Sequence, residues 1–431
     1  MKFLASRWTP WMPAQSTWLE RVILLMLVVA PLFYLSVSHW ITNVSILCAV
    51  LILLSSVFYR NYFSVYHDVE LWPFLGTYVI YFIAISVSQI GRGTFVSKEY
   101  LDQTRWLLGV PIFAFLLYLR IKFSDALRWI APLIVLFSWV SSTFVMPSDA
   151  WGNRATIEFM DPLAFGFMNL SVGLMCLVIA ALNLKQGRLS KLAILNVVGF
   201  MVGTYLSLRS GSRTGWLAFP FVLLLIARTL FENPAGKKIS VLLFLALPLV
   251  AVLLLSSTTD IRLAAFVDEV SSYPWRGGVA SDTSVGMRIT FYRLGAYYFS
   301  QSPWFGWGDR GYLAIKDATE VVTFSTAYTR DFAYNALFHS EWTTQAVRFG
   351  LLGLIAVFWV FAVPFYVFFK HLRSHPLSAQ ASLMGLAFLM CQLAASFSTE
   401  IYSSKGMITF SVVIVAGLLA DVLTDHARTD C

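Results

Sequence analysis

Long apolar runs, separated mostly by short polar connections, make up most of the chain. About twelve of these runs are long enough to cross a membrane as helices, because a span needs roughly 20 apolar residues. The fourth run is short, so we expect it to be tilted or to belong to a longer helix. The predicted spans are 20–38, 41–58, 71–90, 106–119, 129–146, 162–182, 192–208, 214–229, 239–257, 344–368, 379–397 and 407–424. This pattern predicts an all-α polytopic integral membrane protein.

One connection, at 258–343, is long and of mixed polarity. Connections of this length are uncommon unless they are functional. The run from Val285 to Phe299 has the pattern of an amphipathic helix that is able to lie on a bilayer surface. We therefore expect a large, partly helical loop subdomain. The predicted division is 1–257 for spans one to nine, 258–343 for the loop subdomain, and 344–431 for the last three spans and a tail.

Composition agrees with a membrane protein. Hydrophobic residues make up 58% of the chain and charged residues only 13%, which is too apolar for a soluble domain. The net charge of +8 does not indicate nucleic acid, because the basic residues are scattered over short connections. Three of the four cysteines fall within apolar runs and none has metal-ligand spacing, so neither a metal site nor a structural disulfide is expected.

The basic residues predict the orientation of the chain. If the N-terminus is inside, the inner connections carry sixteen lysines and arginines and the short outer ones carry seven. This bias favours N- and C-termini in the cytoplasm and places the long loop outside. The seven outer residues are Arg92, Lys98, Arg105, Arg154, Arg209, Arg213 and Lys405. Topology does not require these outer cations, so they become candidates for binding.

Arg209 and Arg213 stand between two predicted spans, at a membrane boundary. Charge is costly there unless it faces water, protein or an anionic ligand. Arg213 is expected to open the next helix, with Ser210 or Ser212 as N-cap, and arginine at a helix N-terminus suits phosphate. The alternative is that both side chains extend to the interface and only anchor the helix ends.

Histidine is the usual acid or base near neutral pH. The predicted topology leaves His39 in a short outer turn and His339 at the end of the long loop. A lone histidine at a helix start is often only a cap or a surface residue, but His339 shares its face with the outer arginines. The chain has no P-loop, no Rossmann glycine pattern and no Gly-x-Ser-x-Gly elbow.

Four motifs resemble those of bacterial O-antigen ligases. His339-Ser340, nine residues and Gly350-Leu-Leu-Gly353 resemble their H-[NSQ]-x9-G-x-x-[GTY] motif. Arg213-Thr-Gly-Trp-Leu217 is similar to their R-x3-L motif, and Pro303-Trp-Phe-Gly-Trp-Gly308 to their P-x-x-G-x-G. The stretch from Arg154 to Asp161-Pro162 resembles their arginine and N/D-P stretch, with Asp161 in place of the more usual asparagine. The resemblance covers roughly 150–360.

The resemblance implies a GT-C-like glycosyltransferase of the bacterial inner membrane with a periplasmic active site. Such ligases transfer O-antigen polysaccharide from undecaprenyl diphosphate to the lipid A-core, without metal or nucleotide. The matching positions imply His339 as the base that deprotonates the acceptor hydroxyl, with inversion at the anomeric carbon. Arg213 and Arg288, with Arg209, would hold the diphosphate, because arginine binds phosphate bidentately. Arg154 and Arg293 are further candidates for substrate contacts.

Two other functions remain open at this stage. An O-antigen polymerase of the same superfamily would share architecture and donor but use a growing glycan as acceptor. A transporter or flippase of lipid-linked glycans is less favoured, because the chain shows neither polar residues near the bilayer midplane nor two similar halves. The expected partners are therefore the lipid-linked donor, the lipid A-core acceptor and membrane lipid, and no nucleic acid.

Overall fold

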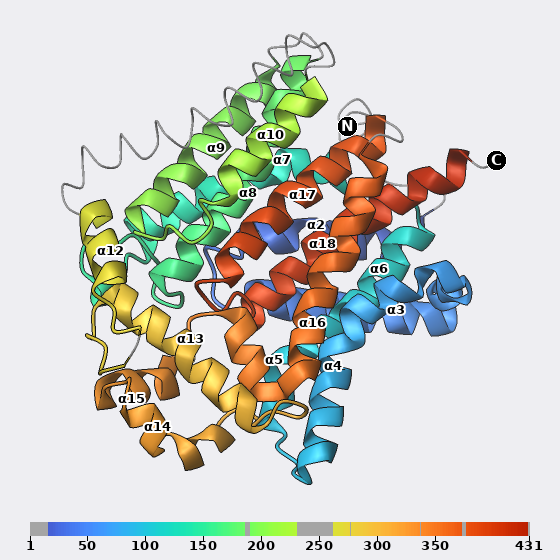
Figure 1. The fold of residues 1–431 in the computed structure, drawn as a ribbon. Coiled ribbons are helices and arrows are strands. Elements are labelled where there is room, and N and C mark those ends of the chain that lie inside the picture. The colour runs from blue at the N-terminus through green and yellow to red at the C-terminus, as the bar shows by residue number, and fades with distance from the viewer. Residues whose placement is uncertain are drawn as a thin grey trace.

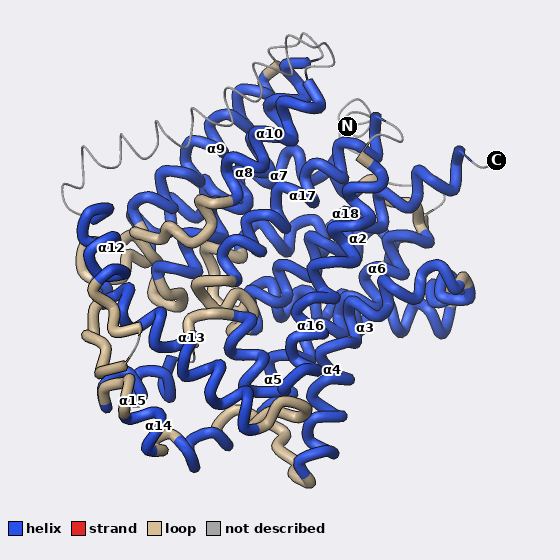
Figure 2. The backbone as a smooth tube through the Cα atoms, in the orientation of Figure 1, coloured by secondary structure: helices blue, strands red, loops and turns tan. Residues whose placement is uncertain are grey.

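The computed structural model describes residues 16–185, 190–230, 262–275, 277–336, 338–372 and 376–429. Over these ranges the protein is helical, and the only β-type contact found in them is an isolated bridge between Pro147 and Ile157. Within the same ranges, eight helices are long and apolar enough to cross a membrane. The prediction of an all-α polytopic membrane protein is confirmed, as Figures 1 and 2 show.

Eleven of the twelve predicted spans coincide with helices, and the segment predicted at 239–257 lies outside the described residues. The corresponding helices are α2 (Trp18–Val29), α3 (Trp40–Phe58), α4 (Trp72–Arg92), α6 (Gly109–Tyr118), α7 (Phe123–Val140), α8 (Pro162–Lys185), α9 (Lys191–Arg209), α10 (Ala218–Leu230), α16 (Glu341–His371), α17 (Pro376–Ser396) and α18 (Lys405–Thr429). As expected, the fourth predicted span corresponds to the short helix α6.

The start of helix α7 was predicted too late in the sequence. The span expected from residue 129 begins at Phe123, where the backbone N–H of Ser124 donates to the Asp421 carboxylate of α18 at 2.9 Å. A carboxylate at a helix N-terminus satisfies an otherwise unpaired N–H and favours the positive end of the helix dipole. Because this cap comes from the other end of the chain, local sequence gives no sign of it.

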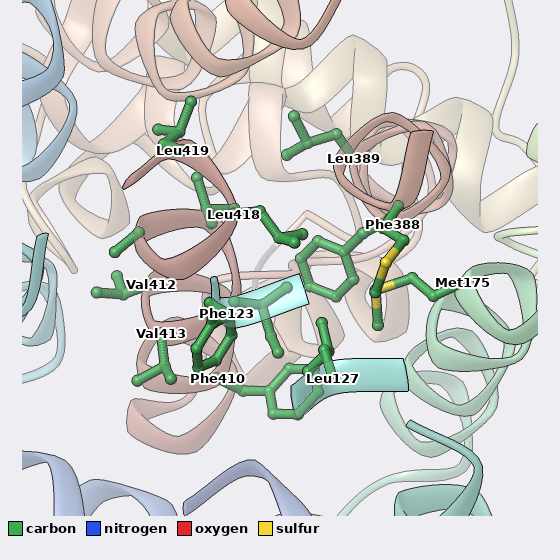
Figure 3. Close-up of a cluster of buried hydrophobic side chains, with 14 of the residues drawn as sticks. Phe123, Leu127, Met175, Phe388, Leu389, Phe410, Val412, Val413, Leu418 and Leu419 are labelled. Carbon is green, nitrogen blue, oxygen red and sulfur yellow. The ribbon is translucent and has the colours of Figure 1, made fainter. Parts of the chain in front are cut away.

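The largest core lies where α7, α8, α17 and α18 meet. Phe123, Met175, Phe388 and Phe410 pack there with leucines and valines of α18 (Figure 3). The neighbouring α8 and α9 approach closely at Gly203, where an added Cβ would lie 2.6 Å from the Asn169 carbonyl oxygen. Small residues permit such close approach between helices in a membrane.

Residues 262–336 form a second group of shorter helices, which we call the loop segment. Its elements are α12 (Arg262–Ser271), α13 (Ser284–Gln301), the 3-10 turn η7 (Gly311–Ile315), α14 (Thr319–Val322) and α15 (Ala327–Ala336). Figure 1 shows them together at the lower left of the molecule. Phe291, Tyr298, Tyr312 and Phe324 contribute to a small core of its own, which includes Val347 of α16.

Helix α16 is broken at Gly350, and residues 303–308 dock into the break. Gly350 has φ 64° and ψ −145°, a region that essentially only glycine adopts. Trp307 and Gly308 donate their backbone N–H groups to the carbonyls of Val347 and Arg348, both at 2.8 Å. Leu351 N–H donates to the Pro303 carbonyl at 2.7 Å. The docking loop (303–308) thus replaces hydrogen bonds that a continuous helix would make.

Candidate active site

His339 lies at the junction between the loop segment and α16. Its φ is 48°, in the left-handed region that histidine enters more readily than most residues. Ser340 caps α16, with its Oγ accepting from Thr343 N–H at 3.3 Å. Phe338 N–H donates to the Thr344 hydroxyl at 3.3 Å. These bonds on both sides hold the histidine in its unusual backbone conformation.

The His339 ring is packed between aromatic side chains and is only partly exposed. Its centroid lies 5.5 Å from that of Phe291 and 5.7 Å from that of Phe332. The side chain is 23% exposed, but Nδ1 is buried and makes no hydrogen bond to any part of the chain that the structure describes. The exposed part of the ring therefore excludes Nδ1, which leaves Nε2 as the nitrogen available to a substrate.

Charges of both signs act on the histidine. Burial lowers the pKa of His339 below its ordinary 6.5, the charge of Arg288 lowers it further, and the charge of Asp161 opposes both. Burial also lowers the pKa of Arg288, and the charge of Arg154 acts in the same direction. Arg288 forms no ion pair with the described acidic residues. Two neighbouring guanidinium groups beside a histidine make an environment that favours an anion.

Arg154 connects this group to the turn that follows α9. Its Nε donates to the Ser210 carbonyl at 2.6 Å, and Ala155 N–H donates to the Arg209 carbonyl at 2.9 Å. The side chains of Arg209 and Arg213 are exposed. No hydrogen bond or ion pair joins either of them to Arg288 or His339 within the described ranges. The structure thus places Arg288 near His339 and Arg154 near Arg288, and it leaves Arg209 and Arg213 on the adjoining turn.

The expectation that Arg213 opens a helix is wrong. Helix α10 begins only at Ala218, so Arg213 lies within the preceding turn, where its carbonyl accepts from Trp216 N–H at 3.2 Å. Ser210 and Ser212 do not cap α10. Ser210 Oγ donates to the Ser207 carbonyl at 2.8 Å and Ser212 Oγ to the Leu163 carbonyl at 3.1 Å. Both hydroxyls therefore stabilise the turn itself and its contact with α8.

Arg293 is engaged within the loop segment. Its guanidinium lies 4.3 Å from the ring centroid of Phe324 and 5.7 Å from that of Tyr273. It also donates to the Tyr273 hydroxyl at 3.4 Å. These contacts give Arg293 a packing role that requires no substrate.

The Asp161-Pro162 pair begins helix α8. The Asp161 carboxylate accepts from the N–H groups of Leu163 and Ala164, at 2.9 and 3.0 Å, and Pro162 is the first helical residue. An acidic or amide N-cap followed by proline is a strong helix start, and asparagine and aspartate cap about equally well. The aspartate in place of asparagine therefore preserves the cap and adds a charge that acts on His339.

Sequence reasoning missed Glu400, which lies in the connector between α17 and α18. Its carboxylate is buried, and Oε2 lies 3.9 Å from His339 Nδ1. Glu400 follows α17 and lies outside the long loop that precedes His339 in the sequence. A single acidic residue in a short outer connection, on the same predicted face as His339, was the only signal available.

The fold and the site together define a polytopic helical membrane protein. A histidine and a partly buried arginine lie at the junction of its loop segment and its helix bundle. A family model described as O-antigen ligase matches residues 198–358. This match supports a place in the O-antigen ligase superfamily and an O-antigen ligase or polymerase type of function. It is also similar to a Haemophilus influenzae protein described as uncharacterized, with 20% identity over 356 residues, which cover 80% of this chain and 84% of that protein.

Proposed function

We propose that this protein is an O-antigen ligase of the bacterial inner membrane. It transfers polysaccharide from undecaprenyl diphosphate to a sugar hydroxyl of the lipid A-core on the periplasmic face. The observation that carries the proposal is the grouping of His339, Arg288 and Arg154, because the charge of Arg288 acts on the histidine and the charge of Arg154 acts on Arg288. This is the combination of base and anion site that the reaction requires.

The arginines would hold the diphosphate of the donor. Arginine remains charged even when it is buried, and its planar guanidinium matches two phosphate oxygens. Arg288 provides the buried charge, and Arg154 and the adjoining Arg209 and Arg213 extend the positive surface. As the bond between the anomeric carbon and the diphosphate breaks, negative charge grows on the leaving group, so these cations stabilise the transition state more than the ground state.

His339 would act as general base. The acceptor oxygen attacks the anomeric carbon, its proton passes to His339 Nε2, and undecaprenyl diphosphate leaves from the opposite side, which inverts the anomeric centre. The base must be neutral to accept the proton. Because burial and Arg288 lower the pKa of His339, the neutral form dominates at neutral pH, and activity should fall only as pH drops through this lowered value.

The first test uses cells that lack the protein. A ligase predicts free lipid-linked polymer and bare lipid A-core on lipopolysaccharide gels. Loss of long chains with one repeat still attached to the core would indicate a polymerase instead.

The second test is His339→Ala in the purified, full-length protein in lipid nanodiscs. Turnover should fall about 10²–10⁴-fold, the usual contribution of a general base, while donor binding and the unfolding temperature change little. Substantial activity in His339→Ala, together with a rate that does not change between pH 5 and 8, would leave His339 with a structural role only.

A further inference from the structure

The connector between α17 and α18 (397–404) brings a buried carboxylate to the catalytic histidine. The side chain of Glu400 is only 8% exposed, although it stands between two spans. The hydroxyl of Tyr292 on α13 donates to the Phe397 carbonyl, which ties this connector to the loop segment. A buried carboxylate is costly unless hydrogen bonds or a cation compensate it. The groups that contact the Glu400 carboxylate therefore indicate its role.

The two oxygens of Glu400 have different surroundings. Oε1 accepts a hydrogen bond from the Thr344 hydroxyl at 2.9 Å, and Thr344 Oγ in turn accepts from Phe338 N–H at 3.3 Å. Oε2 is the oxygen that lies 3.9 Å from His339 Nδ1. Thr344 thus fixes the carboxylate to the backbone next to the histidine and leaves the second oxygen towards the ring.

The Nδ1 atom of His339 is the second buried polar group in this arrangement. It is buried, and no residue described in the structure forms a hydrogen bond with it. A separation of 3.9 Å is too long for a hydrogen bond, but catalytic hydrogen bonds are often long before the substrate binds and shorten in the complex. A small rotation of the imidazole towards Glu400 would give the buried Nδ1 a hydrogen-bond acceptor.

We propose that Glu400 is a positioning residue that accepts the Nδ1–H hydrogen bond of His339 and keeps Nε2 unprotonated and directed to the acceptor hydroxyl. The proposal rests on the proposed role of His339 as base. When His339 takes the acceptor proton, its imidazolium carries Nδ1–H and Nε2–H, and the Glu400 carboxylate stabilises that cation. Glu400 does not touch the substrate, so all of its effect passes through the histidine.

The charges around the pair set its pH response. Burial raises the pKa of Glu400 to about 7, the Thr344 hydrogen bond opposes this rise, and the charge of Glu341 on α16 adds to it. His339 faces Arg288 of α13 and Asp161 ahead of α8. Glu400 is therefore ionised above about pH 7 and becomes neutral as pH falls. The stabilising charge is lost in the same range in which the histidine begins to take up protons.

Glu400→Gln tests the proposal, since glutamine keeps the size and can still accept from Thr344 but has no charge. In nanodiscs, with lipid-linked donor and lipid A-core acceptor, kcat should fall roughly 10- to 100-fold with KM nearly unchanged, a part of the base's contribution. The acid midpoint of the pH profile should move to lower pH, because the titration of Glu400 near pH 7 is removed and only that of His339 remains. In the His339→Ala background, Glu400→Gln should have no further effect.

Matched variants separate positioning from folding. Glu341→Gln removes a second buried carboxylate, whose partners are Tyr81, Gln345 and Tyr402. It should reduce kcat far less than Glu400→Gln does, because these hydrogen bonds of Glu341 do not go to His339. If Glu400→Gln does not accumulate, Thr344→Val frees the carboxylate while retaining it, and kcat should fall several-fold. Thr343→Val, an isosteric change one residue away, serves as its control.

The outcomes are distinct for the two proposals. Activity in His339→Ala would overturn the base and the proposed function with it. An inactive His339→Ala with a wild-type rate and pH profile in Glu400→Gln would overturn the positioning role alone. The positioning role would also be overturned if the loss of kcat caused by Glu400→Gln were as large in the His339→Ala background as in the wild type. The carboxylate would then act independently of the histidine.

Discussion

At the scale of single residues, the His339 imidazole lies between charges of opposite sign. Arg288 lowers its pKa and Asp161 raises it, while burial sets the larger part of the shift. The protonation of the base is thus adjusted by two residues that also have other roles, since Arg288 is proposed to hold phosphate and Asp161 caps α8. Their substitution should move the pH profile in opposite directions.

Asp161→Asn should shift the acid limb of the rate to lower pH. The substitution removes the negative charge that raises the pKa of His339, so the base stays neutral further into the acid range. Stability should change by less than about 0.5 kcal/mol, because asparagine is an equally good N-cap, whereas Asp161→Ala should cost about 0.5–2 kcal/mol. A pH–rate profile and thermal unfolding measure both effects. An unchanged midpoint in Asp161→Asn would show that its charge does not reach the base.

Arg288→Ala should have the opposite effect on the acid limb and a large effect on the rate. Without the positive charge the pKa of His339 rises, so activity should begin to fall at a higher pH. Loss of charge-assisted hydrogen bonds to phosphate, at about 1.5–3 kcal/mol, should reduce kcat/KM roughly 10- to 100-fold, and Arg288→Lys should recover only part of it.

The control for Arg288 is Lys316→Ala, which removes one exposed positive charge from the same loop segment, where it pairs with Asp331 at 2.7 Å. It should leave both the rate and the midpoint close to wild type. Equal losses in the two variants would indicate that only the net charge of the segment matters, and the diphosphate role of Arg288 would be withdrawn.

At the scale of elements, the break in α16 explains two of the sequence motifs together. The glycines of the docking loop and of α16 lie face to face, and an added Cβ at Gly306 would lie 2.5 Å from the Arg348 carbonyl carbon. Asp309, directly after the docking loop, pairs with Arg348 at 2.9 Å. The N-terminal part of α16, which directly follows His339 and the N-cap Ser340, is thereby held by the loop segment.

Gly350→Ala should therefore destabilise the protein strongly. The alanine Cβ would lie 2.6 Å from the Pro303 carbonyl oxygen and would occupy a backbone region that costs about 1–3 kcal/mol. Gly93→Ala is the matched control, because Gly93 has φ 65° but no atom within 4 Å of the added Cβ. It should cost only about 1–2 kcal/mol from the left-handed backbone. Thermal unfolding in detergent compares the two, and equal shifts would mean that the docking loop adjusts easily.

At the scale of the whole molecule, the proposed orientation places the loop segment in the periplasm. Cys48, Cys176 and Cys391 are buried, so single introduced cysteines can be labelled after Cys431 is replaced by serine. A membrane-impermeant thiol reagent should reach Ser281→Cys in intact spheroplasts and Lys370→Cys only after the membrane is opened. Both positions are exposed in the structure. The reverse pattern would overturn the orientation and the periplasmic site together.

The spans could be predicted because each is recorded locally as a long apolar run, and His339, Arg288 and Arg154 because their motifs resemble a family. The start of α7 could not be predicted, since its cap is Asp421, almost 300 residues away. The break at Gly350 depends equally on a distant segment, and two glycines alone do not indicate it. Glu400 was missed for the same reason. Its carboxylate comes within 3.9 Å of His339 Nδ1 only in the folded chain, and nothing in the local sequence indicates this proximity.

The proposed site is not contained within the family-matched region at 198–358. Arg154 and Asp161 reach the site from before it, and Glu400 reaches it from the connector that follows α17. A chimera that exchanges only the matched region with a relative would therefore take the segment around His339 from the relative. It would keep Glu400, Arg154 and Asp161 from this protein. Functional exchange between such proteins should require breakpoints ahead of residue 154 and beyond residue 404. Acceptor or donor preference should therefore be inherited in blocks larger than the matched region.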